Sequence, residues 1–136
     1  MSLHQLSRIL LLCLIVSFVI SCKKDPGEGG NSVIKGKVIR RNYTVFPIRF
    51  AESPGKDEDV YIIYGEGSNA FDDRTKASYD GTFKFETLKK GKYRIYVYTD
   101  DTVATNYGNT TEVIVETEIT KNRSEKEIPT ITIINL

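Results

Sequence analysis

From Val33 onward, apolar and polar residues alternate in short stretches that are separated by turn-forming residues. A period of two places successive side chains on opposite faces of a strand, as where Phe83 and Phe85 alternate with Lys84 and Glu86. Helical periodicity is absent, so the pattern predicts an all-β domain. We expect strands at about 33–41, 59–65, 73–79, 82–86, 92–99, 111–118 and 127–134, with 43–50 as an edge strand or extended loop.

Strands of this number and length favour a β-sandwich in which one face of each sheet is buried and the other is wet. The predicted fold is a seven-stranded Greek-key β-sandwich over residues 33–136. Asp80-Gly81 lies between two predicted strands and is typical of a type I′ hairpin, which needs a positive φ at both central residues.

A further pattern of turn and core residues runs from residue 80 to residue 97. An Asp-Gly turn is followed by an aromatic-x-aromatic strand, a leucine, a Gly-x-Tyr turn and an alternating apolar strand. This order resembles the carboxypeptidase regulatory-like family, which implies a transthyretin-like (prealbumin-like), immunoglobulin-like sandwich. Because the matching residues form turns and core, the resemblance implies no functional residue. They are Asp80, Gly81, Phe83, Phe85, Leu88, Gly91, Tyr93, Ile95 and Val97.

The N-terminal segment has a different pattern, a run of 12 residues from Ile9 to Ile20 that is broken only by Ser17. It is shorter than the roughly 20 apolar residues of a membrane span but suits a signal peptide. Its end, Val19-Ile20-Ser21-Cys22, resembles the lipobox of bacterial lipoproteins. The resemblance implies that residues 1–21 are a cleaved signal peptide and that Cys22 becomes the lipid-modified N-terminus. The alternative is an ordinary secretory signal with a chance cysteine.

Residues 22–32 connect this anchor to the predicted domain. From Lys23 onward they contain no apolar side chain, one proline and three glycines, which predicts a flexible tether. Lys23 and Lys24 do not provide the acidic residue that retains some lipoproteins in the inner membrane, so we expect anchoring in the outer membrane. The choice between its periplasmic face and the cell surface stays open.

The mature chain would have few of the side chains that commonly serve in catalysis. Without residues 1–21 its basic and acidic residues balance to zero, which gives no indication of nucleic-acid binding. Its histidine is removed and its remaining cysteine, Cys22, is acylated, so neither side chain can serve as a nucleophile or base. We therefore expect no enzyme, cofactor or metal, but a binding or assembly module for an envelope protein or a glycan.

Three tyrosines are the candidate recognition residues. Tyr61, Tyr96 and Tyr98 should alternate outward if Ile95 and Val97 face the core. Exposed tyrosines can stack on sugar rings or fill a partner interface. Alternatively, they form cross-strand pairs that only stabilise the sheet. A carbohydrate-binding surface lipoprotein is the alternative function that this surface predicts.

Acidic clusters and one threonine complete the candidates. Residues 57–59, 72–73 and 100–101 are acidic and lie at predicted strand ends, which favours solvated loop charges. The alternatives are a calcium site or the carboxylates of a hydrolase. Asp101-Thr102-Val103 resembles a bacterial O-glycosylation signal and makes Thr102 a possible modification site.

Overall fold

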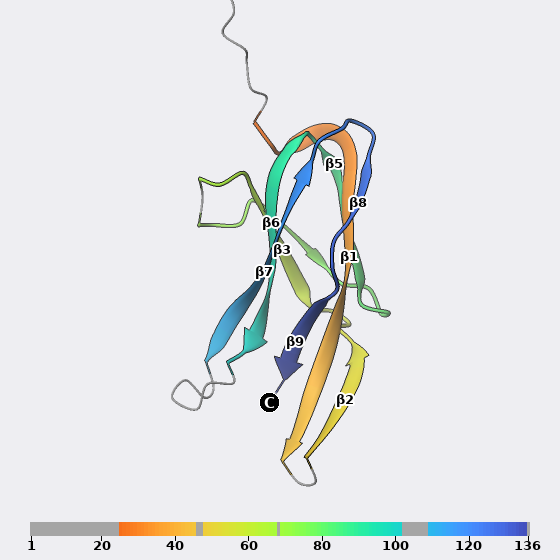
Figure 1. The fold of residues 1–136 in the computed structure, drawn as a ribbon, viewed down its shortest axis with the longest axis vertical. Coiled ribbons are helices and arrows are strands. Elements are labelled where there is room, and N and C mark those ends of the chain that lie inside the picture. The colour runs from red at the N-terminus through yellow and green to blue at the C-terminus, as the bar shows by residue number, and fades with distance from the viewer. Residues whose placement is uncertain (1–24, 46–47, 68, 102–108, 136) are drawn as a thin grey trace, which may run out of the picture.

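The structure, a computed structural model, describes residues 25–45, 48–67, 69–101 and 109–135. Nine strands in two sheets make up this part of the chain, so the predicted all-β sandwich is confirmed (Figure 1). The described ranges include no helix that is long and apolar enough to cross a membrane.

The first sheet is built around one long strand, β1. Its N-terminal half pairs antiparallel with β5 and parallel with β8, and its C-terminal half pairs antiparallel with β2 and parallel with β9. The strands are β1 (Glu28–Val45), β2 (Ile48–Pro54), β5 (Thr82–Leu88), β8 (Glu125–Glu127) and β9 (Ile131–Asn135).

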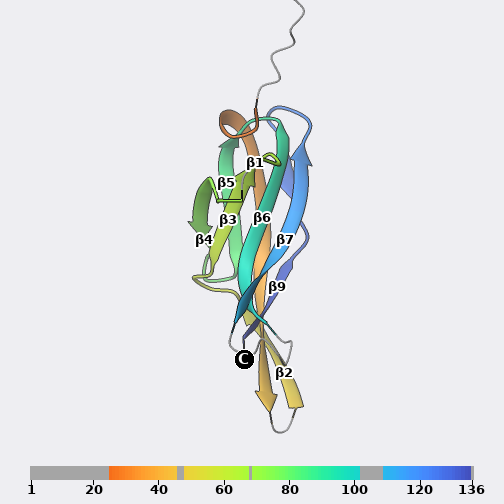
Figure 2. The ribbon, with the colours of Figure 1, turned by 90° about the vertical axis from the view of Figure 1, so that its left-hand side faces the viewer.

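The second sheet is antiparallel and has the order β4-β3-β6-β7. Figure 2 shows it nearer the viewer, in front of β1 and β9. Its long strands β6 and β7 pair over their whole length, from Gly91 opposite Ile119 to Asp100 opposite Thr110. The strands are β3 (Asp59–Tyr64), β4 (Asp73–Lys76), β6 (Gly91–Asp100) and β7 (Thr110–Ile119).

Alternate side chains of both sheets meet in one core, as the period of two predicts. Phe83 and Phe85 are buried, and their neighbours Lys84 and Glu86 are exposed. The most fully buried side chains come from both sheets and include Ile34, Val38, Val60, Ile62, Leu88, Tyr93, Ile95, Val97, Ile119 and Ile131.

The described part has nine strands rather than the predicted seven. The predicted strand 127–134 is divided into β8 and β9, because Pro129 has no amide hydrogen for a continuous ladder. The uncertain segment 43–50 belongs to two strands, the end of β1 and the start of β2, with Val45 opposite Ile48.

The tether predicted over residues 22–32 is wrong for its second half. β1 begins at Glu28, and Gly27 is buried against the sandwich. The Gly27 amide donates to Tyr93 Oη at 3.1 Å, and the Gly27 carbonyl accepts from the Lys89 amide at 2.9 Å. Backbone hydrogen bonds hold this segment, so the lack of apolar side chains did not make it a free linker.

The type I′ hairpin predicted at Asp80-Gly81 is also wrong. Gly81 has a φ of 84°, whereas Asp80 does not adopt a positive φ. The turn is closed by the Gly81 amide, which donates to the Ser78 carbonyl at 2.8 Å. The flanking strands β4 and β5 then separate into different sheets, so this turn connects the two layers of the sandwich.

The molecule is elongated, with different segments at its two ends. The described chain enters at the end that carries the β5–β6 and β7–β8 connections (Figures 1 and 2). At the opposite end, the β1–β2 hairpin extends beyond the sandwich and the chain terminates after β9.

Candidate functional site

The three candidate tyrosines form one cluster on the solvent face of the β4-β3-β6-β7 sheet. Tyr61 and Tyr96 are directly opposite each other in the register of β3 and β6, with ring centroids 5.0 Å apart and an interplanar angle of 15°. The Tyr98 ring lies 5.6 Å from both, edge-on to each. The predicted alternation therefore brings three side chains from two strands into a single aromatic surface.

Two apolar residues that the sequence analysis missed enlarge this surface. The Phe71 ring, from the segment before β4, lies 5.0 Å from the Tyr61 ring and is 50% exposed. Ile114 on β7 is opposite Tyr96 and is 51% exposed. Its signal was present in the run Val113-Ile114-Val115, where three apolar residues in a row place at least one on the outward face. We call Tyr61, Phe71, Tyr96, Tyr98 and Ile114 the aromatic cluster.

The tyrosines of the cluster differ in how much of each side chain is exposed to solvent. Tyr98 is 43% exposed, but Tyr96 is only 5% exposed, so the expectation that all three would be accessible is wrong for Tyr96. Tyr96 is covered because aromatic rings flank it on the same face. Burial, followed by the hydrogen bond with Tyr98, raises the pKa of the Tyr96 phenol to about 12. Tyr98 and Phe71 provide the accessible rings.

Charged residues surround the cluster on the same sheet. Arg74 is opposite Tyr61, and Glu112 is opposite Tyr98. One row further along, Arg94 is opposite Glu116. The aromatic surface therefore has a polar rim with both donors and acceptors.

A polar cleft of about 360 Å³ adjoins the cluster where β6 and β9 end and β7 begins. Tyr98 belongs to both, because it lines the cleft as well as contacting the other tyrosine rings. The polar side chains of the lining include a cation, two carboxylates, a hydroxyl and an amide. These are Arg40, Glu58, Asp100, Thr99 and Asn135.

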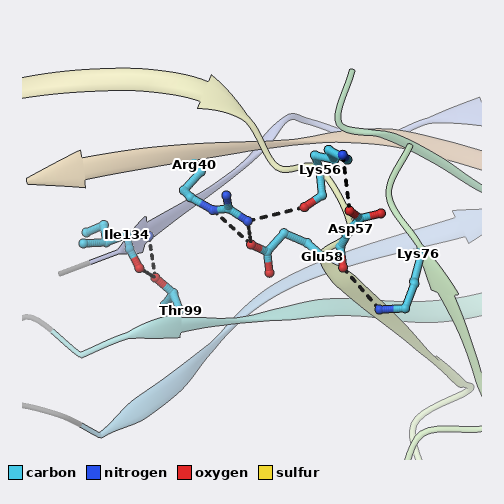
Figure 3. Close-up of polar contacts among 7 residues, drawn as sticks. All are labelled: Arg40, Lys56, Asp57, Glu58, Lys76, Thr99 and Ile134. Atoms are coloured by element: carbon cyan, nitrogen blue, oxygen red, sulfur yellow. Dashed lines mark hydrogen bonds and ion pairs between the residues drawn. The ribbon is translucent and has the colours of Figure 1, made fainter. Parts of the chain in front are cut away.

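Contacts between the two sheets hold the walls of this cleft in place (Figure 3). Arg40 of β1 forms an ion pair with Glu58, and its Nε donates to Glu58 Oε1 at 3.1 Å. Arg40 Nη2 also donates to the Lys56 carbonyl at 3.4 Å. Thr99 Oγ1 accepts from the Ile134 amide at 2.6 Å. The Arg40 and Glu58 side chains are therefore positioned before any ligand arrives.

The aspartates of the predicted acidic clusters mostly have local partners. Asp59 forms an ion pair with Lys76 at 3.3 Å, and Asp72 Oδ2 accepts from the Tyr64 amide at 2.7 Å. Asp73 Oδ1 likewise accepts from the amide of the next residue. Asp100 lines the cleft. No group of three possible metal ligands occurs among the residues described.

Two candidate modification sites, Cys22 and Thr102, lie outside the described residues. The signal peptide, the lipid anchor and the possible O-glycosylation therefore stay predictions.

Comparison with known proteins gives distant likenesses. No protein-family model and no curated protein matches the chain. It is similar to the structure of a candidate carbohydrate-binding protein from Pseudomonas aeruginosa, with 12% identity over 78% of this chain and 90% of that one and a TM-score of 0.49. It is also similar to (S)-allantoin synthase, with 10% identity over 75% of this chain and 42% of that one and a TM-score of 0.44. Likenesses this distant carry no argument about activity, so any functional conclusion depends on the geometry of the chain itself.

Proposed function

We propose that this protein is a non-enzymatic binding module, anchored in the bacterial outer membrane through Cys22, which binds a glycan of the cell envelope. The observation that carries the glycan proposal is the position of Tyr98. Its half-exposed ring joins the aromatic cluster to the polar cleft.

Sugar recognition needs the two kinds of surface that meet at Tyr98. An aromatic ring can pack against the apolar face of a pyranose, and fixed polar side chains can bind its hydroxyl groups. The cleft of about 360 Å³ falls in the range of small-molecule pockets, roughly 300–1,000 Å³. Arg40 and Glu58 hold each other in place, which limits the entropy lost when a ligand is bound.

The envelope location rests on the sequence. The apolar run from Ile9 to Ile20 and the lipobox-like Val19–Cys22 support export and acylation of Cys22. More than one acyl chain gives stable anchoring where a single chain is marginal. A Cys22→Ser protein is therefore expected to leave the membrane fraction and to lose label from radioactive fatty acid. Unchanged membrane attachment would contradict the anchor.

The resemblance to carboxypeptidase regulatory-like domains is part of this proposal. The residues that carry it include Phe83, Phe85 and Tyr93, which are buried, and Gly81, which adopts the positive φ of a turn. Their positions agree with a structural role for the motif. The binding residues would then be particular to this chain.

Binding is tested with an array of bacterial envelope glycans and two matched variants. Tyr98→Ala should abolish the response because it removes the ring shared by cluster and cleft. Tyr79→Ala removes a tyrosine that is 82% exposed and lies in the turn between β4 and β5, so it should leave binding unchanged. Equal responses of the two variants would overturn the glycan proposal.

Catalysis is tested on the same glycans. A glycoside hydrolase needs two carboxyl groups about 5–10 Å apart across the scissile bond, and Glu58 and Asp100 are the carboxylates of the cleft. Because Glu58 is engaged with Arg40, we expect no new reducing ends when bound glycans are incubated with the protein. Release of reducing ends that Asp100→Asn abolishes would establish the hydrolase instead.

A protein partner is the second candidate, and the exposed side chains of Ile114 and Phe71 favour it. Apolar side chains of this size are typical of the centre of protein interfaces. In this case the glycan array stays blank, and one envelope protein co-purifies after detergent extraction. Ile114→Asp should then release that partner, whereas Tyr79→Ala should retain it.

A further inference from the structure

The end at which the chain enters the sandwich contains a second hollow, of about 390 Å³. Its lining comes from the start of β1, from the β5–β6 connection and from the β7–β8 connection. It consists of two glycines at the irregular start of β1, two asparagines and two lysines, and it contains no carboxylate. The residues are Gly29, Gly30, Asn31, Lys89, Lys90 and Asn122.

Hydrogen bonds between the three segments hold this hollow in shape before a ligand binds. The Lys89 amide donates to the Gly27 carbonyl at 2.9 Å, which joins the first two segments. The Arg123 amide donates to Asn31 Oδ1 at 2.9 Å, which joins the first and the third. Because its oxygen is engaged, the Asn31 side chain has its amide hydrogens left to offer to a ligand.

Glycine is required at the floor of the hollow. A Cβ on Gly30 would lie 2.0 Å from the Leu88 carbonyl oxygen, so no other residue fits against β5 there. Gly29 adopts a φ of 87°, a backbone conformation that residues with a Cβ rarely adopt. The two glycines therefore allow the start of β1 to lie directly against the end of β5, which fixes one wall of the hollow.

Two further basic residues lie near the hollow, while the exposed Glu28 directly precedes the lining residue Gly29. Lys121 and Arg123 lie on the β7–β8 connection that forms one wall, and both are exposed. Among the residues described, none of Lys89, Lys90, Lys121 and Arg123 takes part in an ion pair. Two lysines beside the side-chain amides of two asparagines suit an anion with several acceptor oxygens, such as a phosphate group.

We propose that this hollow binds the phosphate of an anionic lipid headgroup, an inference that rests on the proposed acylation of Cys22. Gly27 is already fixed to the sandwich, so only five residue steps separate it from the lipidated residue. Five extended steps span at most about 18 Å. The acyl chains therefore hold this end of the domain, rather than any other, against the headgroups.

The glycan cleft then faces away from the membrane. β6 begins at Gly91, directly after Lys90, and ends at Asp100 in the cleft. A strand of 10 residues spans about 33 Å, so the two sites lie at opposite ends of the sandwich (Figure 1). The headgroup contact would orient the cleft toward ligands on the far side of the domain.

The test uses the chain from residue 22 with Cys22→Ser, which is unacylated and retains every described residue. It should co-sediment with phosphatidylcholine vesicles that contain phosphatidylglycerol, and much less with pure phosphatidylcholine vesicles. Each lysine near an anionic surface strengthens membrane affinity about fivefold. Lys89→Gln/Lys90→Gln, which removes two lysines, should therefore weaken this association about 25-fold. The matched control Lys56→Gln/Lys76→Gln removes the same charge from exposed lysines in the other half of the molecule and should change it less than about twofold.

Equal weakening by the two double variants would overturn the proposal, because association would then follow net charge alone. Inorganic phosphate distinguishes the source of the ligand. If free phosphate shifts the amide NMR signals of residues 29–31 while vesicles do not, the hollow is a site for a soluble anion and the headgroup proposal fails. This assay needs no acyl chain, so it is independent of the membrane fractionation of Cys22→Ser and of the glycan array.

Discussion

Tyr96 and Tyr98 are two positions apart on one face of β6, yet their surroundings give them different roles. Tyr96 is stacked on Tyr61 and is 5% exposed, so it contributes to the packing of the outer sheet face. Tyr98 lies at the margin of the cluster, where its ring remains 43% exposed beside the cleft. Only the second is available to a ligand.

Truncation of each tyrosine should separate stability from binding. Tyr96→Ala removes a buried ring and should lower the free energy of unfolding by about 3 kcal/mol. Tyr98→Ala loses a partly solvated cross-strand contact and should cost less than about 1 kcal/mol. Urea unfolding followed by circular dichroism measures both. A larger loss for Tyr98→Ala than for Tyr96→Ala would contradict this assignment.

The raised phenol pKa values predict a loss of stability at high pH. Burial is the main reason that the pKa values of Tyr64 and Tyr96 rise from 10 to about 12. The folded state therefore holds these protons more tightly than the unfolded state. Their contribution is complete below pH 10 and is lost as the pH rises from 10 to about 12.

Tyr96→Phe provides the control for this pH dependence. It removes one of the groups whose pKa is raised, so its stability should fall less steeply between pH 10 and 12 than that of the native protein. Tyr64 and Tyr93, whose pKa values are raised by burial, and Lys35 and Lys92, whose pKa values are raised by their hydrogen bonds with glutamates, should account for the slope that remains. Urea unfolding at a series of pH values tests this, and parallel curves for the two proteins would contradict it.

Among the structural elements, the segment before β1 shows how backbone contacts can replace apolar side chains. Tyr93 Oη accepts from the Gly27 amide at 3.1 Å and donates to the Lys89 carbonyl at 2.7 Å. One buried hydroxyl therefore fastens the incoming chain to the start of β6. This contact shortens the link between the proposed anchor and the domain.

Removing that hydroxyl should loosen the segment without unfolding the sandwich. Tyr93→Phe leaves the buried Gly27 amide without its acceptor and should cost about 2 kcal/mol of stability. Hydrogen exchange at Gly27 should accelerate more than exchange at Ile95 in the middle of β6. If hydrogen exchange accelerates equally at both amides, the loss of stability is global, and the contact does not act locally on the segment before β1.

The strands could be predicted from sequence where one face alone is buried. The alternation around Phe83 and Phe85 gave β5 and its buried face correctly. The turn at Asp80-Gly81 did not show that β4 and β5 enter different sheets, because local turn chemistry does not determine which strand each one pairs with. The segment 27–32 was misassigned because hydrogen bonds to distant residues such as Tyr93 leave no hydrophobic pattern.

The candidate site was predictable only in part for the same reason. Tyr61, Tyr96 and Tyr98 follow from the period of two. The approach of Phe71 to Tyr61 depends on the path of the chain between β3 and β4, which the sequence pattern does not give. The cleft depends on the ion pair between Arg40 of the first sheet and Glu58, which directly precedes β3 of the second. This contact joins the two layers of the sandwich, and a local sequence pattern does not predict it.

In the molecule as a whole, the sandwich separates two sites of different chemistry. The end where the chain enters presents lysines beside the glycines at the start of β1, and the opposite end presents an aromatic ring beside a polar cleft. A lipid at Cys22 would hold the first against the membrane and leave the second facing the rest of the envelope. This arrangement would suit the proposed function, in which the anchored domain binds a glycan on the side that faces away from the membrane.

The most direct measurement is an amide NMR titration of the chain from residue 22, carrying Cys22→Ser, with the glycan that responds most strongly on the array. We expect the shifted signals to come from Tyr98, Asp100, Arg40 and Phe71, while those of Lys89 and Lys90 stay in place. Shifts that centre on Lys89 and Lys90, or on the β1–β5 ladder, would contradict the assignment of the aromatic cluster and its cleft as the glycan-binding site.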